Sequence, residues 1–167
     1  MIELLSVGER KSRGEADAVA AMVSAEPTLL PTLINITSEG NATVRAHGIT
    51  AVRSLFEQNA TLLHPHKTTI LERLVPIEQW EVRSELCHIL PSLPLTSSER
   101  HDLFAALKGW RGDKSKIVQA WAISALFHLS AQDETLSAEM SQILSEVDSS
   151  APPSVKARVR QLLNEKS

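Results

Sequence analysis

Apolar residues recur along this chain in a pattern that returns about every 37 residues. A valine marks the start of each copy, at Val44, Val82, Val118 and Val155. In nearly every copy the residues 4, 7, 8 and 11 positions after the valine are also apolar or small. These positions lie on one side of an α-helix, because a helix has 3.6 residues per turn. The pattern predicts four helices that each press one apolar stripe against their neighbours.

A second apolar pattern precedes each valine. Leucines stand eleven residues before it, at Leu33, Leu71, Leu107 and Leu144. Apolar residues also stand eight residues before it, at Ile36, Leu74, Trp110 and Val147. Because both helices of a copy keep the same spacing, the repeating unit is predicted to be a pair of helices joined by a turn.

Turn and capping residues set the expected limits of these helices. Prolines and capping residues predict helices over 27–37, 42–58, 64–75, 80–90, 97–108, 115–130, 135–147 and 153–165. A further helix is expected over 16–23, after the charged, glycine-bounded loop 8–14. It has no partner helix of its own, so residues 1–26 are expected to cap the open end of the stack.

The four marker valines and the residues after them resemble the HEAT-type, or armadillo-like, helical repeats. The resemblance rests on Val44-Arg45, Val82-Arg83, Val118-Gln119 and Val155-Lys156, each followed by the apolar stripe. It implies an all-α fold, a right-handed α-α superhelix of about four helical hairpins. We expect a single domain over 1–167, with repeats at about 27–59, 64–94, 97–131 and 134–165.

Composition agrees with a soluble helical protein. Apolar residues make up 43% of the chain, aromatic residues only 4%, and the net charge is −3, which gives no general attraction to phosphate or anionic lipid. No stretch approaches the roughly 20 apolar residues that a membrane-spanning helix needs. The single cysteine, Cys87, is expected to be a packed thiol in a reducing compartment, which favours a cytoplasmic location.

No motif for chemistry stands out. Cys87 and His88 are adjacent on a predicted helix and point about 100° apart, so they do not readily share a metal ion. The sequence contains neither a glycine-rich phosphate loop nor a G-x-S-x-G elbow. We therefore predict no catalytic, cofactor-binding or metal-binding residue.

A binding surface is expected on the side of the second helices that faces away from the stripe. Such a concave face would bind a protein or peptide partner. The residues proposed for it are Thr50, Arg53, Arg83, His88, Ser124, Phe127 and His128. Phe127 is either an exposed anchor for a partner peptide or a core residue between repeats; the sequence leaves both open.

The alternative function is nucleic-acid binding by the 108–121 region. There Trp110, Asp113 and Trp121 lie close to the basic residues Lys108, Arg111, Lys114 and Lys116. This arrangement resembles the HEAT-like alkylpurine DNA glycosylases, in which a basic face presents Trp and Asp at the lesion. The chain as a whole is acidic, so nucleic acid is the less favoured partner.

Overall fold

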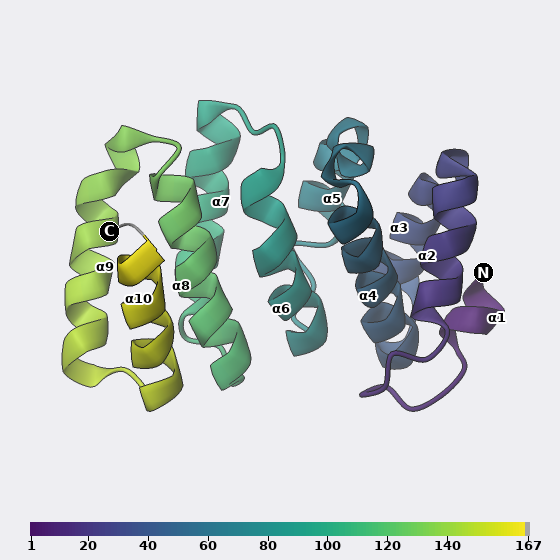
Figure 1. The fold of residues 1–167 in the computed structure, drawn as a ribbon, viewed down its shortest axis with the longest axis horizontal. Helices are drawn as coiled ribbons and strands as arrows, with labels where there is room; N and C mark the ends of the chain where they lie inside the picture. Colours follow the sequence, from purple (N-terminus) through teal and green to yellow (C-terminus); the bar gives the residue numbers. More distant parts are fainter. Residues whose placement is uncertain (166–167) are drawn as a thin grey trace. The chain divides into compact units, whose positions relative to one another are not determined.

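The computed structural model describes residues 1–165, without the side chains at 148–150 and 165. The fold is all-α, as the periodicity predicts, and the chain divides into two compact units, Met1–Pro94 and Leu95–Ser167 (Figure 1). We call them unit 1 and unit 2.

Unit 1 is built around α4, which packs against α2, α3 and α6. Its helices are α1 (Ile2–Leu5), α2 (Ala16–Ala25), η1 (Pro27–Leu29), α3 (Leu30–Glu39), α4 (Ala42–Gln58), η2 (Ala60–His66), α5 (Lys67–Arg73), α6 (Trp80–Ile89) and η3 (Leu90–Ser92). Asn41 starts α4 by accepting hydrogen bonds from the backbone N–H groups of Thr43 and Val44. The first helix of the second pair differs from expectation: Pro65 lies in 3-10 helix, so the α-helix begins only at Lys67.

A glycine sets the distance between α3 and α4. A Cβ atom placed on Gly48 would lie 2.2 Å from Oγ1 of Thr37. Thr37 is fully buried and donates its hydroxyl to the carbonyl of Leu33, so it does not easily move aside. Gly48 stands at a stripe position where other copies have a larger apolar residue, and it allows these two helices to approach closely.

The N-terminal segment is fastened to unit 1 by a buried histidine. The ring nitrogens of His47 lie 2.9 and 3.0 Å from the carbonyl oxygens of Leu5 and Glu9. His47 is completely buried. Gly14 has a φ of +50° and passes so close to this ring that a Cβ there would lie 2.7 Å from it. The charged loop 8–14 is therefore held partly by its backbone, and Arg10 and Arg13 add side-chain contacts to Glu81 and Ser54.

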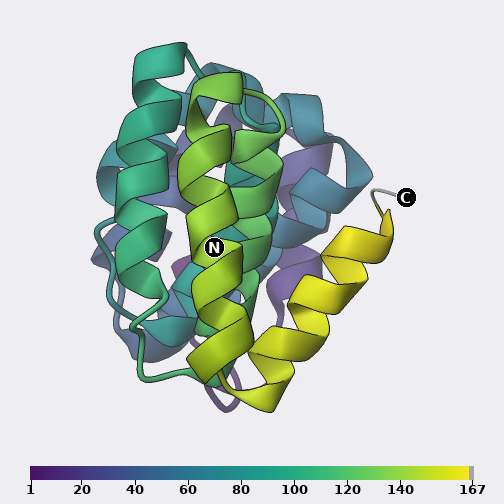
Figure 2. The ribbon, with the colours of Figure 1, turned by 90° about the vertical axis from the view of Figure 1, so that its left-hand side faces the viewer.

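Unit 2 is built around α8, which packs against α7 and α10. Its helices are α7 (Ser97–Trp110), α8 (Lys116–Ser130), η4 (Glu134–Leu136), α9 (Ser137–Ser150) and α10 (Pro153–Glu165). The sequence predicts a capping box at the start of α7, and the structure contains it: Thr96 and Glu99 each accept the other's backbone N–H. Figure 2 shows α10 turning back from the end of α9 at an angle to it.

The apolar stripe forms the core of both units, with one exception. Leu126 is completely buried in α8, whereas Leu163, at the equivalent position of α10, is 46% exposed. The repeat pattern predicts Leu163, eight residues after Val155, on the buried stripe of α10, and this prediction is wrong. Val155, Val159 and Leu162 fill the side of α10 that is buried in unit 2, and Leu163 lies about 100° around the helix from Leu162.

Asp133 joins the start of α7 to η4. Its carboxylate accepts hydrogen bonds from the Thr135 hydroxyl at 2.5 Å, the Ser97 hydroxyl at 3.0 Å and the Arg100 guanidinium at 3.3 Å. These donors favour the charged form, and they lower the pKa of Asp133 from 3.8 to about 2, the bond from Thr135 having the largest effect.

We expect unit 2 to lose stability in acid because of Asp133. A carboxylate whose pKa is lowered by folding stabilises the fold fully above the unfolded pKa, and that contribution disappears as the pH falls from about 4 towards 2. Thermal melts across this range should show a smaller acid-induced drop in Tm for Asp133→Asn than for the wild type. Equal drops in the two proteins would contradict this assignment.

Candidate functional site

Four of the seven residues predicted for partner binding lie in unit 1. Arg53 forms an ion pair with Glu57 at 2.9 Å, and its guanidinium lies 5.6 Å from the centre of the Phe56 ring. Arg83 lies 3.9 Å from the carboxylate of Glu78, a loose surface pair. Both arginines are half-buried on the surface of their helices, α4 and α6.

The other two predicted residues of unit 1 are half-buried as well. Thr50 donates its hydroxyl to the carbonyl of Ala46, one turn earlier in α4, so its hydroxyl is already engaged. His88 lies near the end of α6. The structure therefore places these residues at the surface of the second helices, with part of each side chain accessible.

A half-buried carboxyl group of α6, that of Glu85, lies near Arg53. Glu85 has a raised pKa, chiefly because burial disfavours its charge and also because Glu57 repels it, while Arg53 and Arg13 act in the opposite sense. Nearby, Arg13 pairs with Asp17 and holds the pKa of that carboxyl below its usual value. Most charges on this side of unit 1 are thus compensated within the unit.

The remaining three predicted residues lie on α8 in unit 2. Phe127 is only 7% exposed, so it packs in the core and is not an open anchor. Its ring meets the ring of His128 edge-on, with centroids 5.9 Å apart, and His128 is exposed. Ser124 is also buried, and its hydroxyl accepts a hydrogen bond of 2.8 Å from Arg158 of α10.

Arg158 belongs to a cleft between α8 and α10 that sequence reasoning missed. The cleft has a volume of 360 Å³. It is lined by Lys116, Ile117, Ala120 and Trp121 of α8, and by Ser154, Ala157, Arg158 and Gln161 of α10. Figure 1 shows that the two helices run in the same general direction. We call this feature the α8–α10 cleft.

The α8–α10 cleft combines apolar surface with a fixed positive charge. Ile117 is 49% exposed, and the indole of Trp121 is half-buried. The guanidinium of Arg158 lies 4.5 Å from the centre of the Trp121 ring, a distance at which a cation is attracted to an aromatic face. Such a surface can bind an apolar group and an anionic group side by side.

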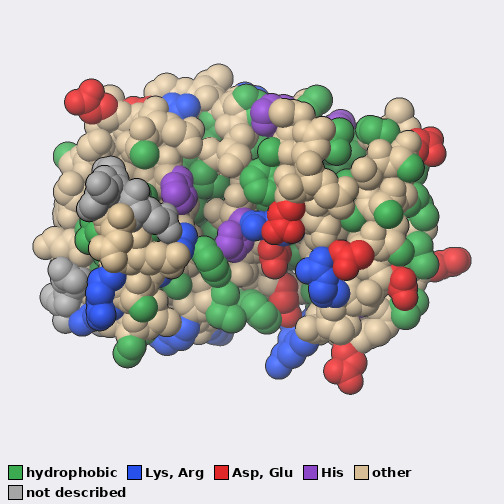
Figure 3. All heavy atoms as spheres, viewed as in Figure 1, with side chains coloured by type: hydrophobic (Ala, Val, Ile, Leu, Met, Phe, Trp, Pro, Cys, Tyr) green, Lys and Arg blue, Asp and Glu red, His purple; other side chains and the backbone are tan. Residues whose placement is uncertain are grey.

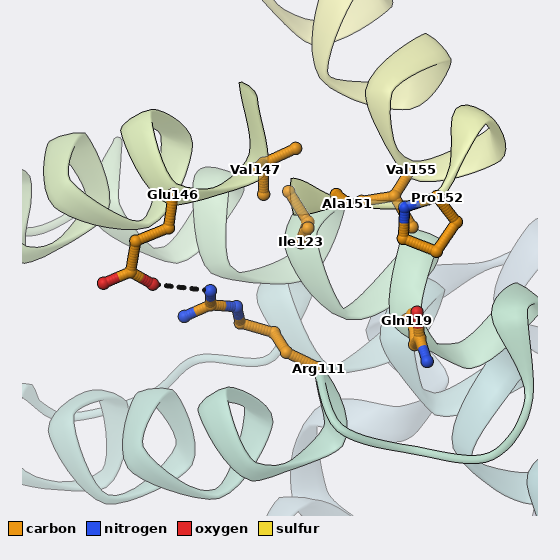
Figure 4. Close-up of a pocket in the computed structure, with 8 residues that line it drawn as sticks. All are labelled: Arg111, Gln119, Ile123, Glu146, Val147, Ala151, Pro152 and Val155. Atoms are coloured by element: carbon orange, nitrogen blue, oxygen red, sulfur yellow. Dashed lines mark hydrogen bonds and ion pairs between the residues drawn. The ribbon is translucent and has the colours of Figure 1, made fainter. Parts of the chain in front are cut away.

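A second, smaller cavity lies between α8, α9 and the start of α10. It has a volume of 160 Å³, and Figure 4 shows Arg111 and Glu146 pointing toward each other across one side of it. Their ion pair of 2.8 Å lowers the pKa of Glu146. Because these two charges neutralise each other, the cavity presents no uncompensated charge to a ligand, in contrast to the α8–α10 cleft.

The 108–121 region does not present the arrangement that nucleic-acid chemistry would need. Trp110 is 5% exposed and belongs to the core. Asp113 accepts a hydrogen bond of 2.7 Å from the backbone of Ser115 before α8. Lys108 contacts the carboxylate of Glu139, and Arg111 pairs with Glu146, so two of the four basic side chains there are neutralised.

Among residues 1–147 and 151–164, no group of three or more His, Cys, Asp or Glu side chains is placed to hold a metal ion. Nor does any helix in that part of the chain combine the length and hydrophobicity of a membrane span. Cys87 is buried and forms no disulfide.

Comparison with known proteins identifies the repeat. A family model described as a HEAT repeat domain matches residues 5–166, almost the whole chain. No curated protein and no solved structure matches the chain. The matched region includes both units and all four marker valines, so the chain belongs to the HEAT-repeat family.

Proposed function

We propose that the protein is a non-catalytic binding module, which uses the exposed surface of its second helices to hold a protein or peptide partner. HEAT repeats commonly mediate protein interactions, and the chain belongs to that family. The observation that carries the proposal is the α8–α10 cleft, where Ile117 and Trp121 present apolar surface to solvent. Exposed apolar surface beside a positioned charge is typical of a partner-binding site.

The residues predicted from the sequence take two roles in this proposal. Thr50, Arg53, Arg83, His88 and His128 supply accessible polar contacts. The other two lie beneath the surface: Ser124 accepts a hydrogen bond from Arg158 at the cleft, and Phe127 belongs to the core of unit 2. The lone, buried Cys87 supports a reducing compartment, and we place the protein in the cytoplasm.

The test is a quantitative pull-down from native lysate with Ile117→Asp. Burying a carboxylate against a partner's apolar surface is unfavourable, so the partner captured by the wild type should be lost. The matched control is Ile2→Asp in α1, because Ile2 is 52% exposed and lies in the other unit. It should retain the partner. A partner retained equally by both variants would remove the cleft from the binding surface.

Nucleic-acid binding is the alternative, and the contacts of the 108–121 region do not favour it. A mobility-shift assay at low and high salt addresses it directly. Binding that releases counterions weakens steeply with salt. We expect no shift of duplex or single-stranded DNA even at low salt.

A further inference from the structure

We propose that the α8–α10 cleft recognises an acidic peptide segment that carries an aliphatic or aromatic side chain next to a carboxylate. This inference rests on the proposed binding function and adds the chemistry of the partner. It follows from the state of Arg158, from the charges around it and from the shape of the lining.

Arg158 is held in place by neutral groups alone. One of its terminal nitrogens donates to the Ser124 hydroxyl and the other to the Gln161 side-chain oxygen, both at 2.8 Å. Its Nε is buried and has no acceptor among the described atoms. The face of Trp121 covers the guanidinium at 4.5 Å. The positive charge is thus oriented by three groups, Ser124, Gln161 and Trp121, before any ligand arrives, and none of those groups cancels it.

Three other basic residues of unit 2 form ion pairs with carboxylates. Arg100 pairs with Asp133, Lys108 with Glu139 and Arg111 with Glu146. Among the described residues, no carboxylate lies within ion-pair distance of Arg158. A preoriented guanidinium without a carboxylate is a ready acceptor of one, because arginine and carboxylate form strong, charge-assisted hydrogen bonds.

Further positive charges surround the cleft. Lys116 lines the cleft and is exposed. Lys114, two residues before α8, and Arg160, on α10, are also exposed. Figure 3 shows Lys and Arg side chains, with hydrophobic ones beside them, at the end of unit 2 where α8 and α10 begin. Both helices also direct their N-termini, which carry partial positive charge, to this end. The field there attracts acidic residues and repels basic ones.

The apolar part of the lining determines what accompanies the carboxylate. Ala120 and Ala157 are small and leave room between the helices, while Ile117 and Trp121 flank that space. A leucine, isoleucine or aromatic side chain of a peptide would bury apolar surface there, which favours binding. An adjacent Asp or Glu would then reach Arg158 or Lys116.

A peptide fits these observations better than a nucleic acid does. Binding to a phosphate backbone draws on a run of several unpaired cations. Here Lys108 and Arg111 are already paired with glutamates, and the centre of the cleft is apolar. One carboxylate would pair with Arg158, and one apolar side chain beside it would contact Ile117 and Trp121.

The experiment is a selection from a random peptide display library with the full chain as bait. We expect the enriched peptides to place Asp or Glu beside a large apolar residue. A selected peptide is then labelled and its Kd measured by fluorescence anisotropy. Its Asn/Gln analogue should bind the wild type about tenfold more weakly or worse, because a charged hydrogen bond is lost. This comparison requires no change in the protein.

Protein variants locate the contact. Arg158→Gln should raise the Kd of the acidic peptide by a factor of about ten but leave the Kd of the Asn/Gln analogue almost unchanged. General unfolding of the protein would not give this pattern. Arg158→Lys keeps the charge without the flat stacking surface, so an intermediate loss is expected. The matched control is Lys108→Gln, which removes a charge already paired with Glu139 and should leave the Kd unchanged.

Each other outcome overturns the proposal. If the enriched peptides lacked acidic residues but lost binding to Ile117→Asp, the acidic partner would be refuted. The proposal that the protein is a binding module would still hold. An absence of any enriched peptide would also refute it, while the lysate pull-down decides the binding module separately. A single-stranded oligonucleotide that binds more tightly than any selected peptide, and depends on Arg158, would make the cleft a nucleic-acid site. Self-association lost in Arg158→Gln would make a second copy the occupant.

Discussion

Replacement of Leu126 by aspartate is expected to unfold unit 2. Leu126 is completely buried in α8, the helix that packs against both α7 and α10. Truncation of a buried leucine alone costs about 2–5 kcal/mol. A carboxylate in the same place adds the cost of burying an unpaired charge, and the total of about 5 kcal/mol or more is comparable to the stability of a whole domain. Circular dichroism at room temperature should show a large loss of helix.

Leu163→Asp is the matched control for that prediction. Leu163 occupies the same position of the repeat in α10, but it is 46% exposed. A charge there stays in contact with water, so stability should change by about 0.5 kcal/mol or less. If the two variants melted within a few degrees of each other, the assignment of the stripe as the core of unit 2 would be wrong.

Gly48→Ala is expected to destabilise unit 1 although alanine ordinarily favours a helix. The new Cβ would lie 2.2 Å from Thr37 Oγ1, far inside van der Waals contact, and α3 and α4 would have to separate. Overpacking of this kind costs typically about 1–3 kcal/mol, and we expect the upper end because Thr37 is fully buried. Urea denaturation gives the change in the free energy of unfolding.

Gly109→Ala provides the opposite expectation from the same substitution. Gly109 lies within α7, and a Cβ placed there meets no atom within 4 Å. Alanine should therefore stabilise unit 2 by about 0.5–1 kcal/mol through helix propensity.

In unit 1, adding Thr37→Ala to Gly48→Ala should recover part of the stability that Gly48→Ala loses, because it removes the atom that clashes. Two additive losses in the double variant would contradict a direct clash.

Much of the fold could be predicted from the sequence because its strongest signal is periodic. The valine spacing and the positions that follow it identify the helices that form the core. The capping box at Thr96 and Glu99 is likewise local, since every group in it belongs to one turn. Leu163 shows where periodicity fails. A helix repeats its pattern along its length, but burial depends on which sides have neighbours.

The candidate site was harder to predict because its important residues are not shared between copies. Three positions after the marker valine stand His47, Glu85, Trp121 and Arg158, four unlike residues. His47 fastens the N-terminal segment, Glu85 is a half-buried acid, and Trp121 and Arg158 form the stacked pair of the α8–α10 cleft. No periodic pattern marks such a row. The assignment of Arg158 also depends on Trp121, which lies 37 residues earlier and meets it only in three dimensions.

The fastening of the N-terminal segment bears on how this protein can vary. His47 contacts main-chain carbonyls, which every amino acid provides, and the side chain of Glu9 is exposed. The path of the segment therefore depends on one histidine and on Gly8 and Gly14, both of positive φ, while Arg10 and Arg13 add side-chain contacts to Glu81 and Ser54. Substitutions of the exposed side chain of Glu9 should therefore leave the fold of this segment unchanged. The lasting signature of this end of the molecule would be two glycines and a histidine some thirty residues downstream.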